Sequence, residues 1–501
     1  MIITDINLGF DDPGDWHSEQ SATRLAPTNP TSSGGVVPAL ISSTLRNACI
    51  ADAERDLKEA YRHLPSDYFD HRTPDKYLFN NIERCVQQYT ETQTDEERRE
   101  LIAHELAQCT TAIVYFGVPW CEQICAFCNF ASSISQSSEV HERYILNLAR
   151  ELDLLQAMGL RDKKVTLAYF GGGTPTVISD DLFQYYLSTT LRALDLTDTA
   201  SVTCEGTVTT LTDRKLAAMR NAGVTRLSTG VQSLDEKVRS VARLRGSPIE
   251  ALEAVERCRN WFEMVNIDLI YGHPYQDVAA WYATVLQIAS LQVPSLTLYR
   301  LEVKPRTMIF KQFQQSSEPF CSEMEARLQY FVARIILEDH GYVETPLGWW
   351  IKRERLTSAV SWKTHMKGWS SASPYFGFGQ GAFTLGRTYY AQNHESLTAW
   401  EQSIAQMQLP YRSVRGLDPK VPFLNVLFRT LRTTCEIDLE AISEEFEQLS
   451  LTVQFRRILD DFTKWGLFER SENRYTLTLA GRSTIHWILA DLVSELGSPA
   501  A

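Results

Sequence analysis

Residues 115–130 read YFGVPWCEQICAFCNF and place Cys121, Cys125 and Cys128 at the spacing C-x3-C-x2-C. The apolar residues before Cys121 indicate a strand, so the cysteines lie on a short loop that follows it. Three thiolates on such a loop can bind three corners of a cubane iron–sulfur cluster and leave one iron open to a non-protein ligand. The alternatives are a zinc site or unliganded cysteines. Structural zinc usually requires a fourth Cys or His in paired spacing, and the next histidine along the chain is His141.

Strand-like and helix-like segments alternate from this loop to about residue 303. The expected strands are 111–118, 164–172, 200–206, 226–233, 265–272 and 295–303. Strand–helix repeats of this length imply parallel strands with right-handed crossovers. We therefore expect an α/β fold with a partial (β/α)6 barrel, in which function gathers at the carboxyl ends of the strands.

A glycine run, GGGTP at 171–175, comes at the end of the second expected strand. Three glycines let the backbone approach a ligand closely and present amide N–H groups. Alone, such a run is often a plain turn. Glu205, Gln232 and Asp268 also fall at or just after expected strand ends. The cysteines, the glycines and these polar residues should therefore meet at one end of the barrel.

The motif CxxxCxxC, with an aromatic residue before its third cysteine and GGGTP after it, resembles the radical S-adenosylmethionine (SAM) superfamily. Within it, the chain is similar to the oxygen-independent coproporphyrinogen III dehydrogenase family. That family also includes haem chaperones, anaerobic haem-degrading enzymes, class C radical methyltransferases and natural-product cyclopropanases. The resemblance covers about residues 111–310 and continues more faintly through YFGFGQGAF at 375–383 and the C-terminal region.

The resemblance implies the cofactors and the residues that hold them. Cys121, Cys125 and Cys128 would ligate a [4Fe-4S] cluster, whose open iron would chelate the amino and carboxylate groups of SAM. Phe127 would flank the adenine. The amino end of SAM would meet Gly172, Gly173 and Thr174.

Further SAM contacts are implied for Tyr115, Glu205, Gln232, Arg243, Asp268 and Glu302. Gln232 and Arg243 match the glutamine and arginine that hold the ribose and the carboxylate, and Asp268 matches the aspartate near the ribose. For each of these residues the alternative is a structural role, either aromatic packing or a hydrogen bond or salt bridge. Tyr115 and His273 are the candidate catalytic residues.

The chain departs from the family pattern at several positions. Gly117 replaces the histidine usual in YVHIPFC, and Phe130 stands where coproporphyrinogen dehydrogenases carry a further cysteine. His273 lies in YGHPYQ, where relatives usually read YGLPGQ, and we expect it at a strand end facing the pocket. It is a candidate proton carrier; the alternative is a hydrogen bond behind the site. The aromatic and basic stretch 348–362 is a candidate pocket wall.

These departures favour methyl or methylene transfer to an unsaturated or aromatic small molecule in secondary metabolism. The resemblance implies one or two SAM molecules, of which one yields the 5′-deoxyadenosyl radical. Alternatives are oxidative decarboxylation of a porphyrinogen, another radical reaction such as ring opening, and a haem chaperone or haem-binding protein. The family also implies an electron donor such as a flavodoxin or ferredoxin.

Composition excludes several other classes of protein. The 501 residues carry 49 Lys and Arg against 62 Asp and Glu, a net charge of −13. That balance argues against a general nucleic-acid binder, which needs a basic surface. The apolar runs are far shorter than the 18 or so residues of a membrane span, and the N-terminus lacks the features of a secretory signal. We expect a cytoplasmic protein without a disulfide framework, because ten cysteines are too sparse for one.

Four regions are expected along the chain. They are an N-terminal arm and helical extension at 1–110, the radical SAM barrel core at 111–320, a mixed α/β region that completes the barrel and the substrate pocket at 321–415, and a helical, winged-helix-like domain at 416–501. Winged helices often bind DNA, but this one is rich in acidic residues. A packing or substrate-lid role is therefore favoured for it.

Overall fold

Parallel strands form the centre of the fold. The computed structural model describes residues 42–65, 68, 94–130, 132–344, 347–356, 373–386, 388–416, 423, 427–428, 430–432, 434–446 and 449–494. Within these residues a twelve-stranded sheet has the order β14-β13-β12-β11-β1-β4-β5-β6-β7-β8-β10-β9. Its parallel strands are β1 (Thr111–Val118), β4 (Lys164–Gly172), β5 (Leu196–Thr207), β6 (Arg226–Gln232), β7 (Val265–Tyr271), β8 (Ser295–Arg300) and β11 (Tyr375–Phe378). The predicted partial barrel is confirmed.

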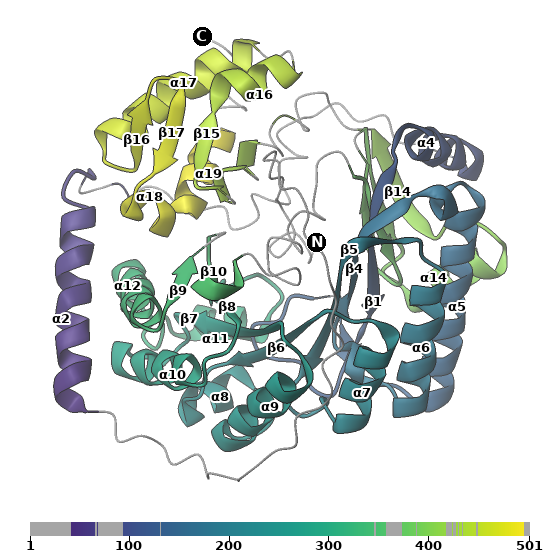
Figure 1. The fold of residues 1–501 in the computed structure, drawn as a ribbon, viewed down its shortest axis with the longest axis horizontal. Helices are drawn as coiled ribbons and strands as arrows, with labels where there is room; N and C mark the ends of the chain where they lie inside the picture. Colours follow the sequence, from purple (N-terminus) through teal and green to yellow (C-terminus); the bar gives the residue numbers. More distant parts are fainter. Residues whose placement is uncertain are drawn as a thin grey trace.

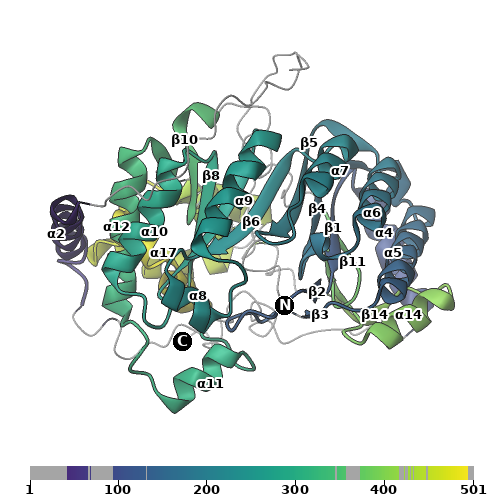
Figure 2. The same ribbon diagram turned by 90° about the horizontal axis from the view of Figure 1, so that it is seen from below.

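Helices cover the outer side of this curved sheet (Figures 1 and 2). They are α5 (Ser138–Ala157), α6 (Asp180–Arg192), α7 (Asp213–Ala222), α9 (Pro248–Trp261), α10 (Val278–Ser290) and α12 (Glu323–Asp339). In β1 every residue from Ala112 to Val118 is buried, as expected for a parallel strand that is covered on both faces. Side chains on the inner face therefore point into the barrel.

Short antiparallel strands extend both edges of the sheet. β9 (Tyr342–Glu344) and β10 (Trp349–Lys352) follow β8, whereas β12 (Phe383–Leu385), β13 (Tyr389–Asn393) and β14 (Tyr411–Gly416) follow β11. The parallel strand β11 was not among the expected strands. It spans four residues, and it pairs with β1 from more than 250 positions further along the chain.

The C-terminal domain has a hydrophobic cluster of its own. Its three-stranded sheet has the order β15-β17-β16. Its elements are β15 (Glu436–Asp438), α16 (Leu439–Phe446), α17 (Leu449–Lys464), β16 (Phe468–Ser471), β17 (Arg474–Leu477), α18 (Leu479–Ser483) and α19 (Ile485–Ser494). The sequence predicts helices at α16, α17 and α19 and a strand at β17, but not the short helix α18 or the short strands β15 and β16. Figure 1 places this domain beside β9, β10 and the end of α2 (Ser43–Ala60).

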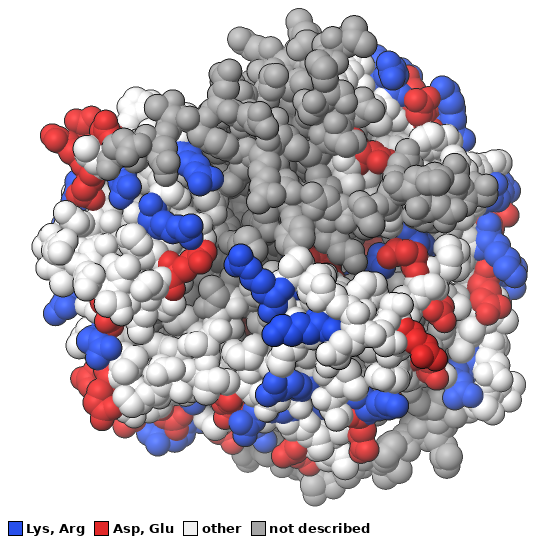
Figure 3. Space-filling view, turned by 180° about the vertical axis from the view of Figure 1, so that it is seen from behind, with Lys and Arg blue, Asp and Glu red and all other residues white. Residues whose placement is uncertain are grey.

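The N-terminal extension contributes α2 and α4 (Asp95–Gln108), and both lie in the region 1–110 that was expected to contain a helical extension. The expected arm at 1–40 lies outside the described residues. None of the helices in the described part of the chain is both long and apolar enough to cross a membrane. Basic and acidic side chains are interspersed over the face shown in Figure 3.

Candidate functional site

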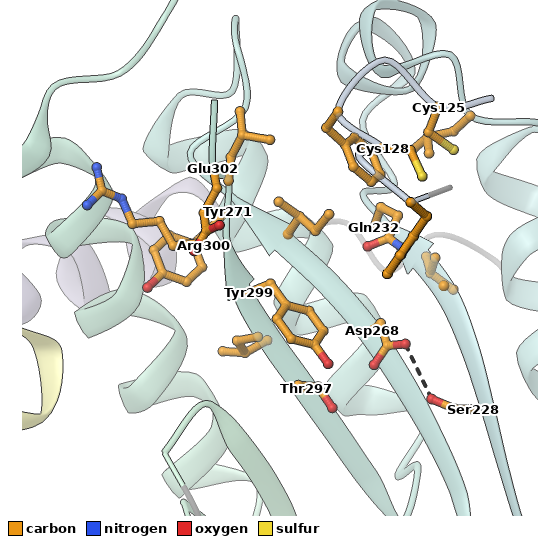
Figure 4. A pocket seen from close by; sticks show the side chains of 18 of the residues that line it. Cys125, Cys128, Ser228, Gln232, Asp268, Tyr271, Thr297, Tyr299, Arg300 and Glu302 are labelled. Atoms are coloured by element: carbon orange, nitrogen blue, oxygen red, sulfur yellow. Dashed lines mark hydrogen bonds between the residues drawn. The ribbon is translucent and has the colours of Figure 1, made fainter. Parts of the chain in front are cut away.

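A cavity of about 380 Å³ opens at the carboxyl ends of the parallel strands. One end is lined by Cys121, Cys125 and Cys128, and the walls come from the loop after β4 and the ends of β5 to β8. Figure 4 shows Cys125 and Cys128 on one side of this space and Arg300 on the other, with Asp268 and Tyr299 between them. The residues expected at strand ends therefore do meet around one space.

Backbone hydrogen bonds hold the cysteine loop in place. The short strands β2 (Trp120–Cys121) and β3 (Ser133–Ile134) pair across its base. At its tip, the Ala126 N–H donates to the carbonyl of Ala242 at the end of α8 (Glu236–Ala242), at 2.9 Å. The Ile309 N–H on α11 (Met308–Gln315) donates to the Ala126 carbonyl, also at 2.9 Å. Figure 2 shows β2, β3, α8 and α11 at the same edge of the barrel.

The glycine run packs directly against the start of this loop. A Cβ atom on Gly173 would lie 2.6 Å from the carbonyl oxygen of Trp120, and one on Gly172 would lie 2.8 Å from that of Val118. Gly172 also has φ +111°, a conformation that L side chains rarely adopt. Thr174 Oγ1 donates to Cys121 Sγ at 3.3 Å. Only glycine lets the two segments approach this closely, so the run is more than a plain turn.

The arrangement of the three cysteines favours a bound iron–sulfur cluster over unliganded thiols. Burial, together with the neighbouring Cys128 and Cys121, raises the pKa of the Cys125 thiol to about 12. Three thiolates this close together need a positively charged partner, which iron supplies on binding. Among the described residues, no three His, Cys, Asp or Glu side chains are already arranged to hold a metal ion. The assignment of the cluster therefore rests on the shared cavity wall and not on a preformed coordination sphere.

Two buried carboxyl groups line the interior of the cavity. Glu205 accepts a hydrogen bond from the Tyr169 hydroxyl at 2.5 Å, and burial raises its pKa to about 7. Asp268 accepts from Asn266 Nδ2 at 2.7 Å and from Ser228 Oγ at 3.3 Å, and burial raises its pKa to about 6. Both carboxyl groups therefore hold a proton more readily than ordinary acids do.

Gln232 lines the cavity in a strained backbone conformation, with φ +65°. Its Oε1 atom is buried and has no hydrogen-bond partner among the described residues. A buried acceptor without a donor is costly. A bound ligand with hydroxyl groups, such as the ribose of SAM, would supply that donor.

Phe127, Arg243 and Glu302 also line the cavity. The exposed Arg243 follows α8, and its Nη1 lies 2.9 Å from the Met308 sulfur at the start of α11. Glu302 forms an ion pair with the buried Lys304 at 2.7 Å. Of the predicted pocket wall at 348–362, Gly348 and Trp349 line the cavity, whereas residues 357–362 lie outside the described residues.

Tyr115 and His273 are not among the residues that line the cavity. Tyr115 stacks on Tyr169 inside the barrel, with 5.8 Å between ring centroids. His273 is 1% exposed and packs edge-on against Phe127, with 5.6 Å between centroids. Burial lowers its pKa to about 3. The expectation that His273 faces the pocket is corrected, because its ring is covered on the protein side of Phe127.

Several lining residues escaped the sequence analysis. Arg432, Arg482 and His486 reach the cavity from the C-terminal domain. No sequence signal joins them to the cysteine motif, because only the folded chain brings the two regions together.

Comparisons with known proteins agree with this geometry. The sequence model of the radical SAM superfamily matches residues 115–285. The chain is 26% identical to the heme chaperone HemW of Bacillus subtilis, over 76% of this chain and 99% of that protein. It is 23% identical to the oxygen-independent coproporphyrinogen III oxidase of Synechocystis sp., over 60% of this chain and 66% of that protein. The structure of coproporphyrinogen III oxidase (HemN) from Escherichia coli superposes with a TM-score of 0.70 and 18% identity, covering 79% of this chain and 93% of that chain.

A parallel barrel that carries a C-x3-C-x2-C loop at its carboxyl end defines a class of protein, the radical SAM superfamily, and residues 115–285 match the sequence model of that superfamily. Within that class the chain is similar to HemW and to coproporphyrinogen III oxidase, and it shares the fold of HemN. The [4Fe-4S] cluster and SAM predicted from the sequence are the cofactors that membership of the superfamily implies.

Proposed function

We propose that this protein cleaves SAM reductively and uses the resulting radical on a small organic molecule held in the same cavity. One observation carries the proposal. The cysteine loop and the glycine run line one end of a cavity that continues past Asp268 and Tyr299 to Arg300 (Figure 4). The same cavity can therefore bring SAM and a substrate together.

The chain's own residues would bind and orient the two cofactors. Cys121, Cys125 and Cys128 would hold the cluster, and the segment 172–174 would meet the amino end of SAM. When bound, the cluster supplies one electron to the sulfonium, which gives methionine and a 5′-deoxyadenosyl radical that takes a hydrogen atom from the substrate. Gln232 Oε1 would accept from a ribose hydroxyl. Glu205 and Asp268, which hold protons readily, could donate hydrogen bonds as well as accept them.

The barrel would protect a reactive radical from water. Tyr299 and Trp349 line the cavity, and Phe127 covers its side next to the cysteines. Aromatic walls exclude water, and water exclusion limits the side reactions of a reactive intermediate. The proposed electron donor is a flavodoxin or ferredoxin.

For the reaction itself, we favour methyl or methylene transfer to an unsaturated small molecule in secondary metabolism. The departures at Gly117 and Phe130 support this choice, and Phe130 lines the cavity at the position of the dehydrogenases' further cysteine. The transfer would use a second SAM. That second SAM would supply the one-carbon unit for an sp2 carbon of the substrate, and S-adenosylhomocysteine would be the by-product.

Porphyrinogen decarboxylation and haem binding are the competing functions, and the names of the relatives support them. Anaerobic incubation of the reconstituted protein with dithionite, SAM and coproporphyrinogen III separates the three possibilities by mass spectrometry. Methyl transfer predicts 5′-deoxyadenosine together with S-adenosylhomocysteine. Loss of carbon dioxide from coproporphyrinogen without S-adenosylhomocysteine would overturn methyl transfer in favour of the oxidase. In a parallel incubation with haem, haem retention without 5′-deoxyadenosine in either mixture would overturn both enzymatic functions.

A further inference from the structure

Two surface segments flank the tip of the cysteine loop. The first, 237–245, contains most of α8 and the residues after it, and the second, 304–315, ends with α11. Both hydrogen-bond to Ala126 at the tip of the loop, through the carbonyl of Ala242 and the N–H of Ile309. Figure 2 shows α11 standing out from the edge of the barrel next to α8. A protein that covers both segments therefore lies over the loop that carries the three cysteines.

The two segments are basic, although the protein as a whole is acidic. The net charge of the chain is −13, yet these segments contain no Asp or Glu. Five of their basic side chains are exposed, whereas Arg239 and Lys304 are buried. The exposed ones are Lys237, Arg243, Arg245, Arg306 and Lys311. This surface is therefore suited to an acidic partner.

The acidic side chains next to the two segments do not cancel this charge. Glu122 and Glu302 each form an ion pair with a residue of the segments, at 3.7 and 2.7 Å. Asp235 and Glu236 precede the first segment, and Glu318 follows the second. The Lys and Arg residues of the segments outnumber these neighbouring acids, even when the paired ones are counted.

Two large aromatic side chains are exposed on the same surface. Tyr275 is 49% exposed and Phe313 is 43% exposed. Lys237 Nζ lies 4.1 Å from the centroid of the Tyr275 ring, and Phe313 packs edge-on against Phe320 with 5.1 Å between centroids. The Tyr275 N–H donates to the carbonyl of Pro319, next to Phe320, at 2.8 Å. Exposed aromatic rings beside basic side chains are typical of protein interfaces.

Five of these residues define what is called the α8–α11 face below. They are Lys237, Tyr275, Arg306, Lys311 and Phe313. The described side chains that line the cavity do not include these five. The face is therefore distinct from the surface that would meet SAM and the substrate.

We propose that the α8–α11 face is the docking surface of the electron donor and that this donor is an acidic flavodoxin. The basic side chains attract its negative charge. The exposed edge of a flavin is apolar and aromatic, and Tyr275 and Phe313 offer rings on which it can pack. In the transfer the flavin loses one electron and the cluster held by this chain gains it. The inference rests on the proposed function, because that function requires a one-electron donor.

The first test measures binding directly. The variant combines Lys237→Glu with Lys311→Glu and reverses two charges on the face. Isothermal titration calorimetry of the reconstituted protein with an acidic flavodoxin should show a Kd about tenfold higher for this variant than for the wild type. Added salt should weaken binding to the wild type, because it screens exposed charges. An unchanged Kd in the folded variant would overturn the proposal.

The second test compares two reductants. Excess dithionite needs no docking surface, so the double variant should form 5′-deoxyadenosine from SAM at the wild-type rate with it. With NADPH, a flavodoxin reductase and flavodoxin, the flavodoxin concentration for half-maximal rate should rise about tenfold. The same flavodoxin dependence in both proteins would contradict the docking surface. A wild type that binds flavodoxin through this face but forms no 5′-deoxyadenosine with dithionite would retain the face and reject the proposed function.

The control is a second double variant, Arg161→Glu with Arg220→Glu. Both arginines are exposed, and they lie just before β4 and at the end of α7 before β6, at the amino ends of the strands. The change in net charge is the same, but flavodoxin should bind as it does to the wild type. Equal weakening in both double variants would show that only the overall charge matters and would overturn the docking surface.

Other occupants of the face predict different results. A wild-type dimer that Lys237→Glu with Lys311→Glu dissociates, measured by light scattering after gel filtration, would assign the face to a second copy and overturn the proposal. Activity with a ferredoxin but not with flavodoxin would overturn the choice of partner. Phe313→Ala is the second variant if the charge reversals prevent folding. It should also weaken flavodoxin binding without changing the dithionite rate, and unchanged binding would contradict the role of the aromatic rings.

Discussion

Gly173 controls how closely the loop after β4 approaches the cysteine loop. An added Cβ would lie 2.6 Å from the Trp120 carbonyl oxygen and 2.9 Å from the Trp120 nitrogen. Gly173→Ala should therefore displace the residues that lead into Cys121. We expect a several-fold loss of iron and sulfide per chain after reconstitution, measured by colorimetric assay.

Gly223→Ala is the matched control for this prediction. Gly223 has a positive φ, of +98°, and an added Cβ there would meet no atom within 4 Å. This substitution should cost about 1 kcal/mol of stability and leave the iron content unchanged. Equal iron content in Gly173→Ala and the wild type would show that the close approach is not needed for the cluster.

For single residues, the sequence predicts which residues form a site better than it predicts where their side chains point. The cysteine spacing and the glycine run indicate a site because local backbone geometry governs both. His273 shows the limit: its place after β7 follows from the strand pattern, but its contact with Phe127 depends on how the cysteine loop folds back. The buried Oε1 of Gln232 depends likewise on a φ of +65° that no local pattern announces.

Among the elements, α5 is tied to the edge of the sheet by one buried carboxyl group. Glu151 accepts from the Gly379 N–H at 2.8 Å, from Asn393 Nδ2 at 2.7 Å, and from Trp400 Nε1, on α14 (Leu397–Ala405), at 3.1 Å. Burial raises its pKa from 4.5 to about 7. These contacts link α5 to the region that follows β11.

The raised pKa of Glu151 predicts a pH dependence of stability. The folded state binds this proton more tightly than the unfolded state, so the free energy of unfolding should fall as pH rises from about 4.5 to about 7 and then level off. Glu151→Gln should change the free energy of unfolding. It should also remove the part of the pH dependence of that free energy that comes from the Glu151 proton. The effect is measured by urea unfolding of both proteins at several pH values, as the difference between their free energies of unfolding at each pH. The same slope in both proteins would contradict the assignment.

The strands show which elements a sequence can predict. The parallel barrel strands β1, β4, β5, β6, β7 and β8 have six to twelve residues each and are separated by amphipathic helices, so local patterns indicate each one. The strands β11, β15 and β16 have only three or four residues each. Such short strands are defined by the partner that they pair with, and in β11 that partner is the distant β1.

At the scale of the whole molecule, Tyr61 joins the barrel to the C-terminal domain. Its ring packs against the hydrophobic clusters of both, and its hydroxyl reaches Ser483. Tyr61→Ala should lower stability by about 3 kcal/mol and loosen the joint. We expect differential scanning calorimetry to resolve a separate, lower-temperature transition for the C-terminal domain.

Tyr61→Phe is the control, because it keeps the ring and removes only the hydroxyl. It should melt close to the wild type. A single transition at the wild-type temperature in Tyr61→Ala would show that other contacts hold the two parts together. The sequence predicted a distinct C-terminal domain from its helices and β17, but its position over the cavity depends on long-range contacts such as this one.

The most direct test of the central claim is SAM cleavage by the reduced, cluster-loaded protein. Wild-type protein and Cys125→Ala would be reconstituted with iron and sulfide, reduced with dithionite under anaerobic conditions and supplied with SAM. The quantity measured is 5′-deoxyadenosine, by mass spectrometry. The account predicts 5′-deoxyadenosine from the wild type and none above background from Cys125→Ala. Equal formation by the two proteins, or none from a fully loaded wild type, would contradict it.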